Sequence, residues 1–531
     1  MSRSGRSIRS TFRRFSALLA ASGLIAGGVA ATATPAAASS PINVIVQGAS
    51  QSALQNLISL VGGHTVTPLP LVNGVYAQVP SSIALTTLQT LGLVTSPDAP
   101  VAVDSLSGAL PSDAPPAANA YPTTTGATRL AAQGVTGDGV GVAVLDTGIT
   151  PLPDFGNRLI GGVDLSGSGN PFLDSYGHGT FVAGLIAGDG SSSAGAYAGE
   201  ATGANLIAVK VAGASGTTDV ATVIQGIAWT ITNRTAYGIK VLNMSLGEVP
   251  TGPTQLNPLD QAVEAAWQAG VTVVTSAGNS GSAAGTITAP GDDPDVITVG
   301  ALADEATTAT ADDSIPSFSS EGPTAANGWL KPDLVAAGRS VVSLRAPGSA
   351  IDQAYPSAQV GTSNFVGSGT SFSAAVTSGA AALVAQQNPA ASPDGIKGRL
   401  LATATPGPVG SATVDGHGDL DAYDAATCPP VRLAQPFTSL VMPVAPGVSI
   451  PLITTWGVSG WNVANFTADV TSNAWNSNAW NSNAWNSNAW NSNAWNSSAW
   501  NSNAWNSNAW NSNAWNSNAW NSNAWNSSTW Q

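Results

Sequence analysis

The chain has 531 residues, so it is too long for one ordinary domain and long enough to bury a substantial core. Only 9% of the residues are charged, and the formal net charge is −14. An acidic surface repels nucleic acid and anionic membranes, so we expect neither as a partner.

Residues 1–38 have the pattern of a secretory signal peptide. Five of the 16 basic residues stand within the first 14 positions, which leaves 11 basic residues against 30 acidic ones in the rest of the chain. A short apolar run at 17–26 and three alanines at 36–38 follow, and they suit cleavage before Ser39. A membrane anchor is the alternative, but the apolar run is short and contains glycine. We therefore expect a secreted, extracellular protein with no membrane span after signal removal.

The next segment, up to residue 104, has the pattern of a small α+β unit. Its predicted strands and helices follow the order βαββαβ, at 42–47, 51–60, 65–69, 72–79, 83–91 and 101–103. A stretch rich in Pro, Ser and Ala follows at 105–119 and is typical of a linker in which a proteolytic cut could fall. A generic α+β module is the alternative to any specialised role for this unit.

Ser371 lies in a sequence that suits a nucleophile. Gly367-Ser-Gly-Thr precedes it, and a run rich in Ala follows that predicts a tightly packed helix ending at Asn388-Pro389. The serine would therefore lie at a helix start, with backbone N–H groups close to its hydroxyl. A Gly-Thr-Ser tripeptide alone is common in loops, so the remaining motifs decide its meaning.

Three further motifs supply the groups that a serine nucleophile needs. Asp146 directly follows the apolar predicted strand at 140–145, at the edge where α/β folds place their sites. His178 is one of only three histidines and begins a predicted helix between two glycines, and a general base near neutral pH is most often histidine. Asn279 follows the predicted strand at 271–274, and its amide can donate to an oxyanion without titrating.

The motifs Asp-Thr-Gly, Gly-His-Gly-Thr, Ala-Gly-Asn and Gly-Thr-Ser stand in this order, and over about residues 126–426 the chain resembles the subtilisin-like serine peptidases. The resemblance implies a three-layer α/β catalytic domain at 120–427 with a mostly parallel central sheet. It also implies a serine endopeptidase that hydrolyses polypeptides through an acyl-enzyme intermediate.

The resemblance implies a role for each residue of the site. Ser371 would be the nucleophile, His178 the general base and then acid, and Asp146 the group that orients the imidazole. Asn279 and the backbone N–H of Ser371 would stabilise the oxyanion. The substrate would pair antiparallel with the extended segment Ser245-Leu246-Gly247.

Two positions depart from the family pattern without touching a catalytic group. The helix after the nucleophile lacks the usual proline, and Ser373 replaces the usual alanine. Thr288 falls where the family often has glycine at the base of the primary specificity pocket. We expect Thr288 to make that pocket shallower and to favour small or medium apolar residues.

The same resemblance implies that residues 39–115 comprise a ferredoxin-like propeptide, which inhibits the enzyme and is removed by self-processing, and its linker. No cofactor is required for the chemistry, although structural calcium is common in the family. Asp189 with Glu200, or Asp292-Asp293, are candidate ligands, but solvated acidic turns are the commoner role of such residues. We assign no metal ligand.

The C-terminal region is of a different kind. Residues 428–471 form either a linker or a small β unit, and the single cysteine, Cys428, excludes an intrachain disulfide. Residues 472–531 repeat Asn-Ser-Asn-Ala-Trp with little variation, and a period of five fits neither an amphipathic helix nor a half-buried strand. A stacking array that binds cell wall or glycan, a solenoid and a flexible low-complexity tail are the alternatives.

Two alternatives to a peptidase follow from these patterns. A non-enzymatic surface-binding protein would use the Trp repeats together with a disabled peptidase fold, but the complete set of catalytic residues argues against it. An esterase would share the acyl chemistry, but the segment Ser245-Leu246-Gly247 favours peptides.

Overall fold

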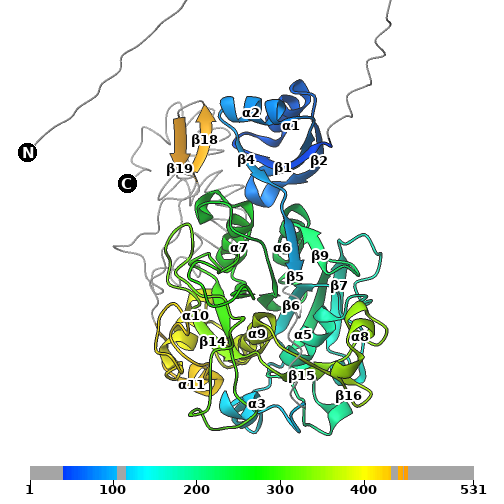
Figure 1. Ribbon diagram of the computed structural model, residues 1–531, viewed down its shortest axis with the longest axis vertical. Helices are drawn as coiled ribbons and strands as arrows, with labels where there is room; N and C mark the ends of the chain where they lie inside the picture. The colour runs from blue at the N-terminus through cyan, green and yellow to red at the C-terminus, as the bar shows by residue number, and fades with distance from the viewer. Residues whose placement is uncertain (1–39, 104–114, 432–440, 446–447, 452–531) are drawn as a thin grey trace, which may run out of the picture. The chain divides into compact units, whose positions relative to one another are not determined.

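A central seven-stranded sheet organises the larger part of the protein. The computed structural model describes residues 40–103, 115–431, 441–445 and 448–451 (Figure 1). The sheet has the order β14-β13-β12-β10-β6-β8-β7, and all six neighbouring pairs are parallel. Its strands are β6 (Gly141–Asp146), β7 (Leu159–Asp164), β8 (Asn205–Lys210), β10 (Ile239–Met244), β12 (Thr272–Ser276), β13 (Ile297–Leu302) and β14 (Leu334–Ala337). The predicted α/β class with a mostly parallel sheet is confirmed.

The composition of the strands and helices explains this architecture. All six residues of β6 are buried, as expected for a parallel sheet whose two faces are both covered. The helices around the sheet are α5 (His178–Ala187), α6 (Val220–Asn233), α7 (Pro258–Gln268), α9 (Thr370–Gln387), α10 (Pro393–Thr403) and α11 (Ala422–Thr427). Helix α9 is buried from Thr370 to Ala385 because its small residues let it pack on all sides. It contacts α5 and the strands β10, β12, β13 and β14.

Short elements complete the larger part of the protein. One three-stranded sheet has the order β11-β5-β9, and a second has the order β15-β17-β16. Their strands are β5 (Pro100–Val103), β9 (Thr217–Asp219), β11 (Leu246–Gly247), β15 (Val341–Leu344), β16 (Gln359–Val360) and β17 (Asn364–Gly367). The short helices are α3 (Tyr121–Thr124), α4 (Ala127–Ala131) and α8 (Ala350–Ala354).

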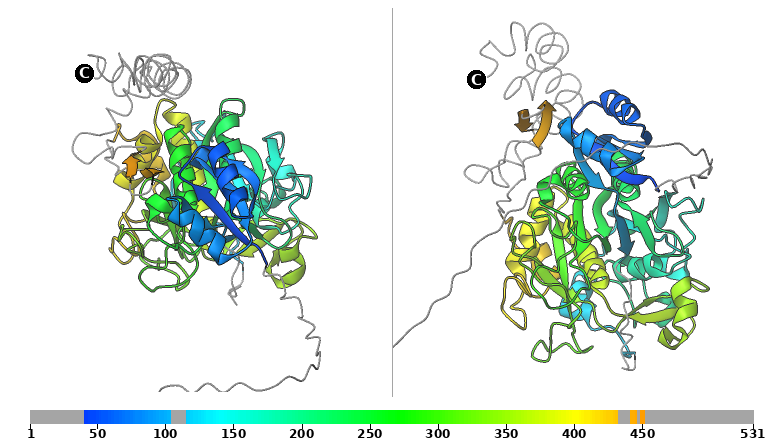
Figure 2. Two further views of the ribbon diagram at one scale, coloured as in Figure 1. Left: turned by 90° about the horizontal axis from the view of Figure 1, so that it is seen from above. Right: turned by 45° about the horizontal axis from the view of Figure 1, so that its top comes forward.

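Residues 41–97 form a small unit with a core of its own. Its elements are β1 (Ile42–Gln47), α1 (Gln51–Leu60), β2 (His64–Leu69), β3 (Gly74–Val79), α2 (Ser82–Thr90) and β4 (Val94–Pro97). The sheet is antiparallel in the order β2-β3-β1-β4, and both helices lie on the same side of it (Figures 1 and 2). Ser50 and Ser81 begin the two helices by accepting backbone N–H groups with their hydroxyls. Ten buried apolar residues fill the space between helices and sheet.

The end of this unit differs from the prediction. The sequence pattern predicts that residues 101–103 supply the last strand of the small sheet, whereas β4 takes that edge position by pairing with β1. Strand β5 instead leaves the sheet and pairs with β11 and β9. The alternation of apolar residues predicts a strand at 101–103 correctly, but it does not say which sheet the strand joins.

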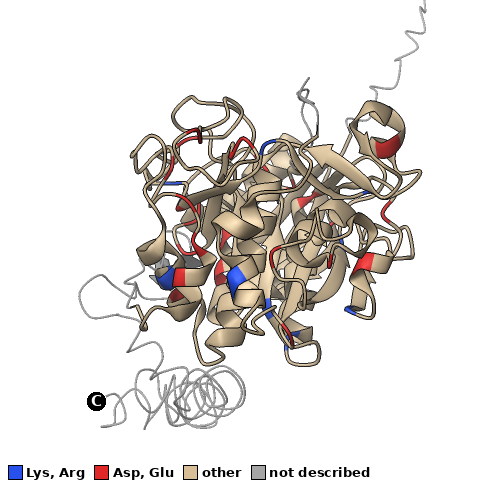
Figure 3. Cartoon of the chain, turned by 90° about the horizontal axis from the view of Figure 1, so that it is seen from below, with Lys and Arg blue, Asp and Glu red and all other residues tan. Residues whose placement is uncertain are grey.

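Further along the chain, β18 (Val441–Ala445) and β19 (Val448–Pro451) pair as an antiparallel hairpin. The predicted signal segment at 1–38 and the Trp repeats at 472–531 lie outside the described residues. In the part of the chain that the structure describes, no helix is both long and apolar enough to cross a bilayer. Lys and Arg are few and lie scattered along the ribbon in the view of Figure 3.

Candidate active site

An aspartate and a histidine lie in contact at the carboxyl edge of the central sheet. Asp146 is the last residue of β6 and His178 is the first residue of α5, so the ends of a strand and a helix meet there. The Nδ1 atom of His178 lies 2.9 Å from both carboxylate oxygens of Asp146. The backbone N–H of Thr147 also donates to Asp146 at 2.7 Å. Both side chains of the pair are fully buried, so their relative orientation is fixed.

A second aspartate, which the sequence reasoning missed, holds the start of helix α5. Asp174 is 3% exposed and accepts the N–H groups of Gly177 and Thr180 at 2.6 and 2.8 Å. Its carboxylate also accepts the hydroxyl of Thr147, which in turn accepts the N–H of Gly179 at 2.9 Å. Burial raises the pKa of Asp174. The signal in the sequence was an aspartate shortly before a helix start, which is a common capping position.

Ser371 lies at the start of the central helix, as predicted. It is the second residue of α9, where backbone N–H groups lack partners within the helix. Its Oγ lies 3.4 Å from the carbonyl of Ser245, whose hydroxyl donates back to the Ser371 carbonyl at 2.9 Å. The nucleophile candidate and the start of the predicted substrate edge are therefore in direct contact.

Asn279 lies beside the same helix start. Its Oδ1 accepts the backbone N–H of Thr370 at 2.9 Å and the Thr370 hydroxyl at 3.0 Å. These two bonds orient the amide so that its Nδ2 is left over as a donor. Within the described residues, Nδ2 is buried and has no hydrogen-bond partner. A buried donor of this kind is suited to an anion that forms only during a reaction.

Strand β11 carries a peptide partner from the chain's own N-terminal region. Leu246 lies opposite Val103, and Gly247 lies opposite Ala102, in an antiparallel register. The side chains of β5 alternate, because Val101 and Val103 are 0% and 1% exposed while Pro100 and Ala102 are exposed. Antiparallel strands run in opposite directions, so β5 reaches Val103 as β11 begins next to Ser245. A chain segment thus occupies the predicted substrate edge.

Thr288 lies next to Gly247 of the predicted substrate edge and next to Gly278. A Cβ added to Gly247 would lie 2.6 Å from the Thr288 hydroxyl, and a Cβ added to Gly278 would lie 3.0 Å from the Thr288 methyl group. The neighbouring residues Ile287 and Ala289 are both 0% exposed, whereas Thr288 is partly exposed. Among these three residues, Thr288 therefore has the side chain that a ligand could reach between the two glycine backbones.

A buried acidic cluster lies where the sequence predicted solvated turns. Asp292 and Asp293 are 1% and 0% exposed, so the expectation of solvent-exposed acidic turns is wrong for this pair. Oxygen atoms of Glu264, Asp293 and Asp295 lie within 4.8 Å of one another, and burial is the main cause that raises the pKa of each carboxyl group. Three carboxylates at this spacing are the ligands that calcium prefers. They fit a structural cation, which would take no part in the reaction.

The other acidic candidates have different surroundings. Asp189 is exposed and lies 3.9 Å from the guanidinium of Arg158. Glu200 is only 3% exposed, and burial raises its pKa to about 8. The expectation of a solvated acidic turn is therefore wrong for Glu200 as well. The low frequency of fully buried acids in proteins explains both errors.

The fold and this edge of the sheet define a class of protein. A parallel α/β sheet that brings together a buried Asp–His pair, a serine at a helix start and an unpaired amide donor is the arrangement of a serine hydrolase. The model of the subtilase family matches residues 137–418. Serine protease AprX of Bacillus subtilis is 45% identical over 278 residues, which cover 51% of this chain and 62% of AprX. Subtilisin Savinase of Lederbergia lenta is 38% identical over 295 residues, which cover 56% of this chain and 93% of Savinase.

The chain belongs to the subtilase family of serine endopeptidases. The crystal structure of fervidolysin from Fervidobacterium pennivorans, a keratinolytic enzyme related to subtilisin, superimposes with a TM-score of 0.58 at 22% identity. That match covers 73% of this chain and 61% of fervidolysin, and it supports the fold alone. The family model and the identity with AprX and Savinase confirm the predicted family.

Proposed function

We propose that the protein is a secreted serine endopeptidase made as a precursor and processed by its own active site. The observation that carries the proposal is the pairing of β5 with β11. A segment of the same chain lies there as a substrate would, with alternate side chains buried and the strand directed towards Ser371. Residues 39–115 would act as an inhibitor and linker, and the catalytic domain would comprise residues 120–427.

The proposed reaction assigns one role to each residue. His178 removes the proton from the Ser371 hydroxyl while the oxygen attacks the carbonyl carbon of the substrate. Asp146 holds Nδ1 of the imidazole at 2.9 Å and stabilises the cation that forms. The oxyanion accepts hydrogen bonds from Asn279 Nδ2 and from the N–H of Ser371. The C–N bond then breaks, and His178 returns the proton to the leaving amine.

Water completes the cycle in the same site. His178 takes a proton from water, the hydroxide oxygen attacks the acyl carbon, and Ser371 leaves with the proton returned by His178. The product is a free carboxylate. The proposed substrate pairs with Ser245, Leu246 and Gly247, and Thr288 limits the depth of the primary pocket. No step needs a metal ion, and calcium would serve stability alone.

The propeptide role is supported by contacts in addition to the strand pair. The Gln47 side chain donates to Gln261 on α7 at 2.7 Å. The carboxylate of Asp98 accepts the N–H of Ala221 at the start of α6 at 3.0 Å. The small unit and the segment that follows it thus contact the N-terminal regions of two helices of the catalytic domain. A product-like strand anchored by these contacts would inhibit the site until it is degraded.

Replacing the nucleophile tests the proposal. We expect Ser371→Ala, expressed at full length in a host without other secreted proteases, to accumulate as a folded and uncleaved precursor. Ser373→Ala is the matched control. Ser373 is as buried as Ser371 and lies on the same helix, and alanine is the residue that the family usually has at this position. Normal maturation of Ser371→Ala, with a circular dichroism spectrum like the wild type, would contradict self-processing.

A further inference from the structure

The short helix α8 packs directly against the loop that carries His178. The N–H of Ala350 donates to the carbonyl of Ser175 at 2.9 Å, and the N–H of Ile351 donates to the carbonyl of Tyr176 at 3.0 Å. Gly177 follows these two residues with a φ of 109°, and a Cβ there would lie 2.5 Å from the Ser349 hydroxyl. The backbone that leads into His178 therefore fits tightly against α8.

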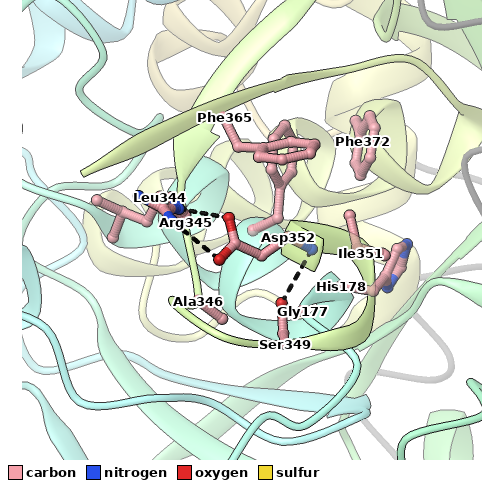
Figure 4. Close-up of a pocket in the computed structure, with 11 residues that line it drawn as sticks. Gly177, His178, Leu344, Arg345, Ala346, Ser349, Ile351, Asp352, Phe365 and Phe372 are labelled. Atoms are coloured by element: carbon pink, nitrogen blue, oxygen red, sulfur yellow. Dashed lines mark hydrogen bonds and ion pairs between the residues drawn. The ribbon is translucent and has the colours of Figure 1, made fainter. Parts of the chain in front are cut away.

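One ion pair holds α8 in place. Both carboxylate oxygens of Asp352 accept from the Arg345 guanidinium, one from Nε and the other from an Nη atom at 2.9 Å (Figure 4). The same carboxylate accepts the N–H of Gly348 and the side-chain amide of Gln359, each at 2.8 Å. The Asp352 side chain is 6% exposed, and its hydrogen bonds with Arg345 lower its pKa. A bidentate pair with four donors on one buried carboxylate is much stronger than an exposed ion pair.

The space between α8 and the catalytic helices is almost filled. A cavity of about 10 Å³, about the least space that holds one water molecule, lies between His178, Ile351, Phe365 and Phe372 (Figure 4). The His178 and Phe372 rings have centroids 5.8 Å apart, and Phe372 directly follows Ser371. Because so little free volume remains, a shift of α8 must move the imidazole or its neighbours.

We infer that Arg345 and Asp352 are positioning residues that fix the imidazole of His178 relative to Ser371. The ion pair orders α8, α8 binds the carbonyls of Ser175 and Tyr176, and these two residues lead into the catalytic helix start. Asp146 fixes one ring nitrogen only, whereas the position of the whole imidazole also depends on this backbone. The inference rests on the proposed role of His178 as general base.

The test is a comparison of turnover per active site in the mature enzyme. Asp352→Asn keeps the shape of the side chain but cannot accept both Arg345 donors as a carboxylate does. A misplacement of about 1 Å costs up to about 10²-fold in rate, so we expect kcat to fall about tenfold with KM within twofold. The kcat of Arg345→Gln and of the double variant should fall by the same amount, because each of the three variants loses the same ion pair. Titration with a fluorophosphonate, run until labelling is complete, counts the reactive sites in each sample.

A matched control separates positioning from stability. Glu305→Gln removes an exposed ion pair, in which a carboxylate oxygen of Glu305 lies 3.1 Å from the Arg339 guanidinium. This variant should leave kcat unchanged. Unchanged kcat per titrated site in Asp352→Asn would overturn the inference, whatever its melting temperature. If Asp352→Asn does not fold, Arg345→Lys gives the same test, since it keeps the charge but loses the two-donor geometry. Turnover that survives in His178→Ala would instead contradict the proposed function.

Discussion

Val101 and Val103 of β5 should supply much of the affinity of the propeptide for the mature enzyme. Both side chains are almost completely buried, at 0% and 1% exposed, while Ala102 between them faces solvent. Val→Ala removes two buried carbon groups, each worth about 0.8 kcal/mol, or about 1.6 kcal/mol in all. A free energy of this size corresponds to about 15-fold weaker inhibition. The isolated segment 39–104 carrying Val101→Ala should therefore show about 15-fold higher Ki in an assay of peptide hydrolysis.

The opposite face of the strand provides the control for this experiment. Ala102→Ser adds a hydroxyl on the exposed side and should leave the Ki within twofold. The core of the small unit includes neither Val101 nor Ala102, so both variants should keep its fold, and circular dichroism checks this. The reasoning fails if Val101→Ala inhibits as tightly as the wild type, or if Ala102→Ser weakens inhibition to the same degree.

Three further predictions concern specificity and pH. Thr288→Gly should deepen the primary pocket and shift cleavage from small or medium apolar residues towards Phe and Tyr, by about 1–3 kcal/mol of discrimination; a peptide-library profile that favours aromatics in the wild type and does not change would refute the assignment. Burial raises the pKa of Asp98 to about 6 in the complex, so its contribution to inhibition is fully present below the pKa of the free carboxyl group and is lost as pH rises through 6. Because Asp98 is partly exposed, we expect Ki to increase by up to about tenfold between pH 4 and 7, and Asp98→Asn to remove that increase. Burial likewise raises the pKa of Glu200 to about 8, so stability is lost as pH rises towards 8, and Glu200→Gln should raise the melting temperature at pH 8 but not at pH 4.

The catalytic candidates could be predicted because each belongs to a short local pattern. Asp146 ends an apolar strand, and His178 and Ser371 begin helices rich in small residues, so the sequence places each on a known kind of element. That the strand end and the two helix starts meet at one edge follows from the parallel sheet. Their roles were carried over from the family resemblance and stay proposals.

Features that depend on long-range contacts could not be predicted in the same way. The spacing of Val101 and Val103 predicts a strand, but only the folded chain shows that β5 leaves its own sheet for β11. Arg345 and Asp352 are seven residues apart and have no sequence pattern that marks them as a buried pair. The burial of Asp292 and Asp293 could not be predicted, because acidic side chains generally lie at the protein surface.

Labelling of the nucleophile tests the central claim most directly. Purified mature protein would be treated with a fluorophosphonate, and mass spectrometry of its peptides would locate the covalent adduct. The account predicts one adduct, on the Ser371 oxygen, with loss of peptide hydrolysis in proportion to labelling and no adduct in His178→Ala. An adduct on another residue, or full peptide hydrolysis in protein whose Ser371 is completely labelled, would contradict it.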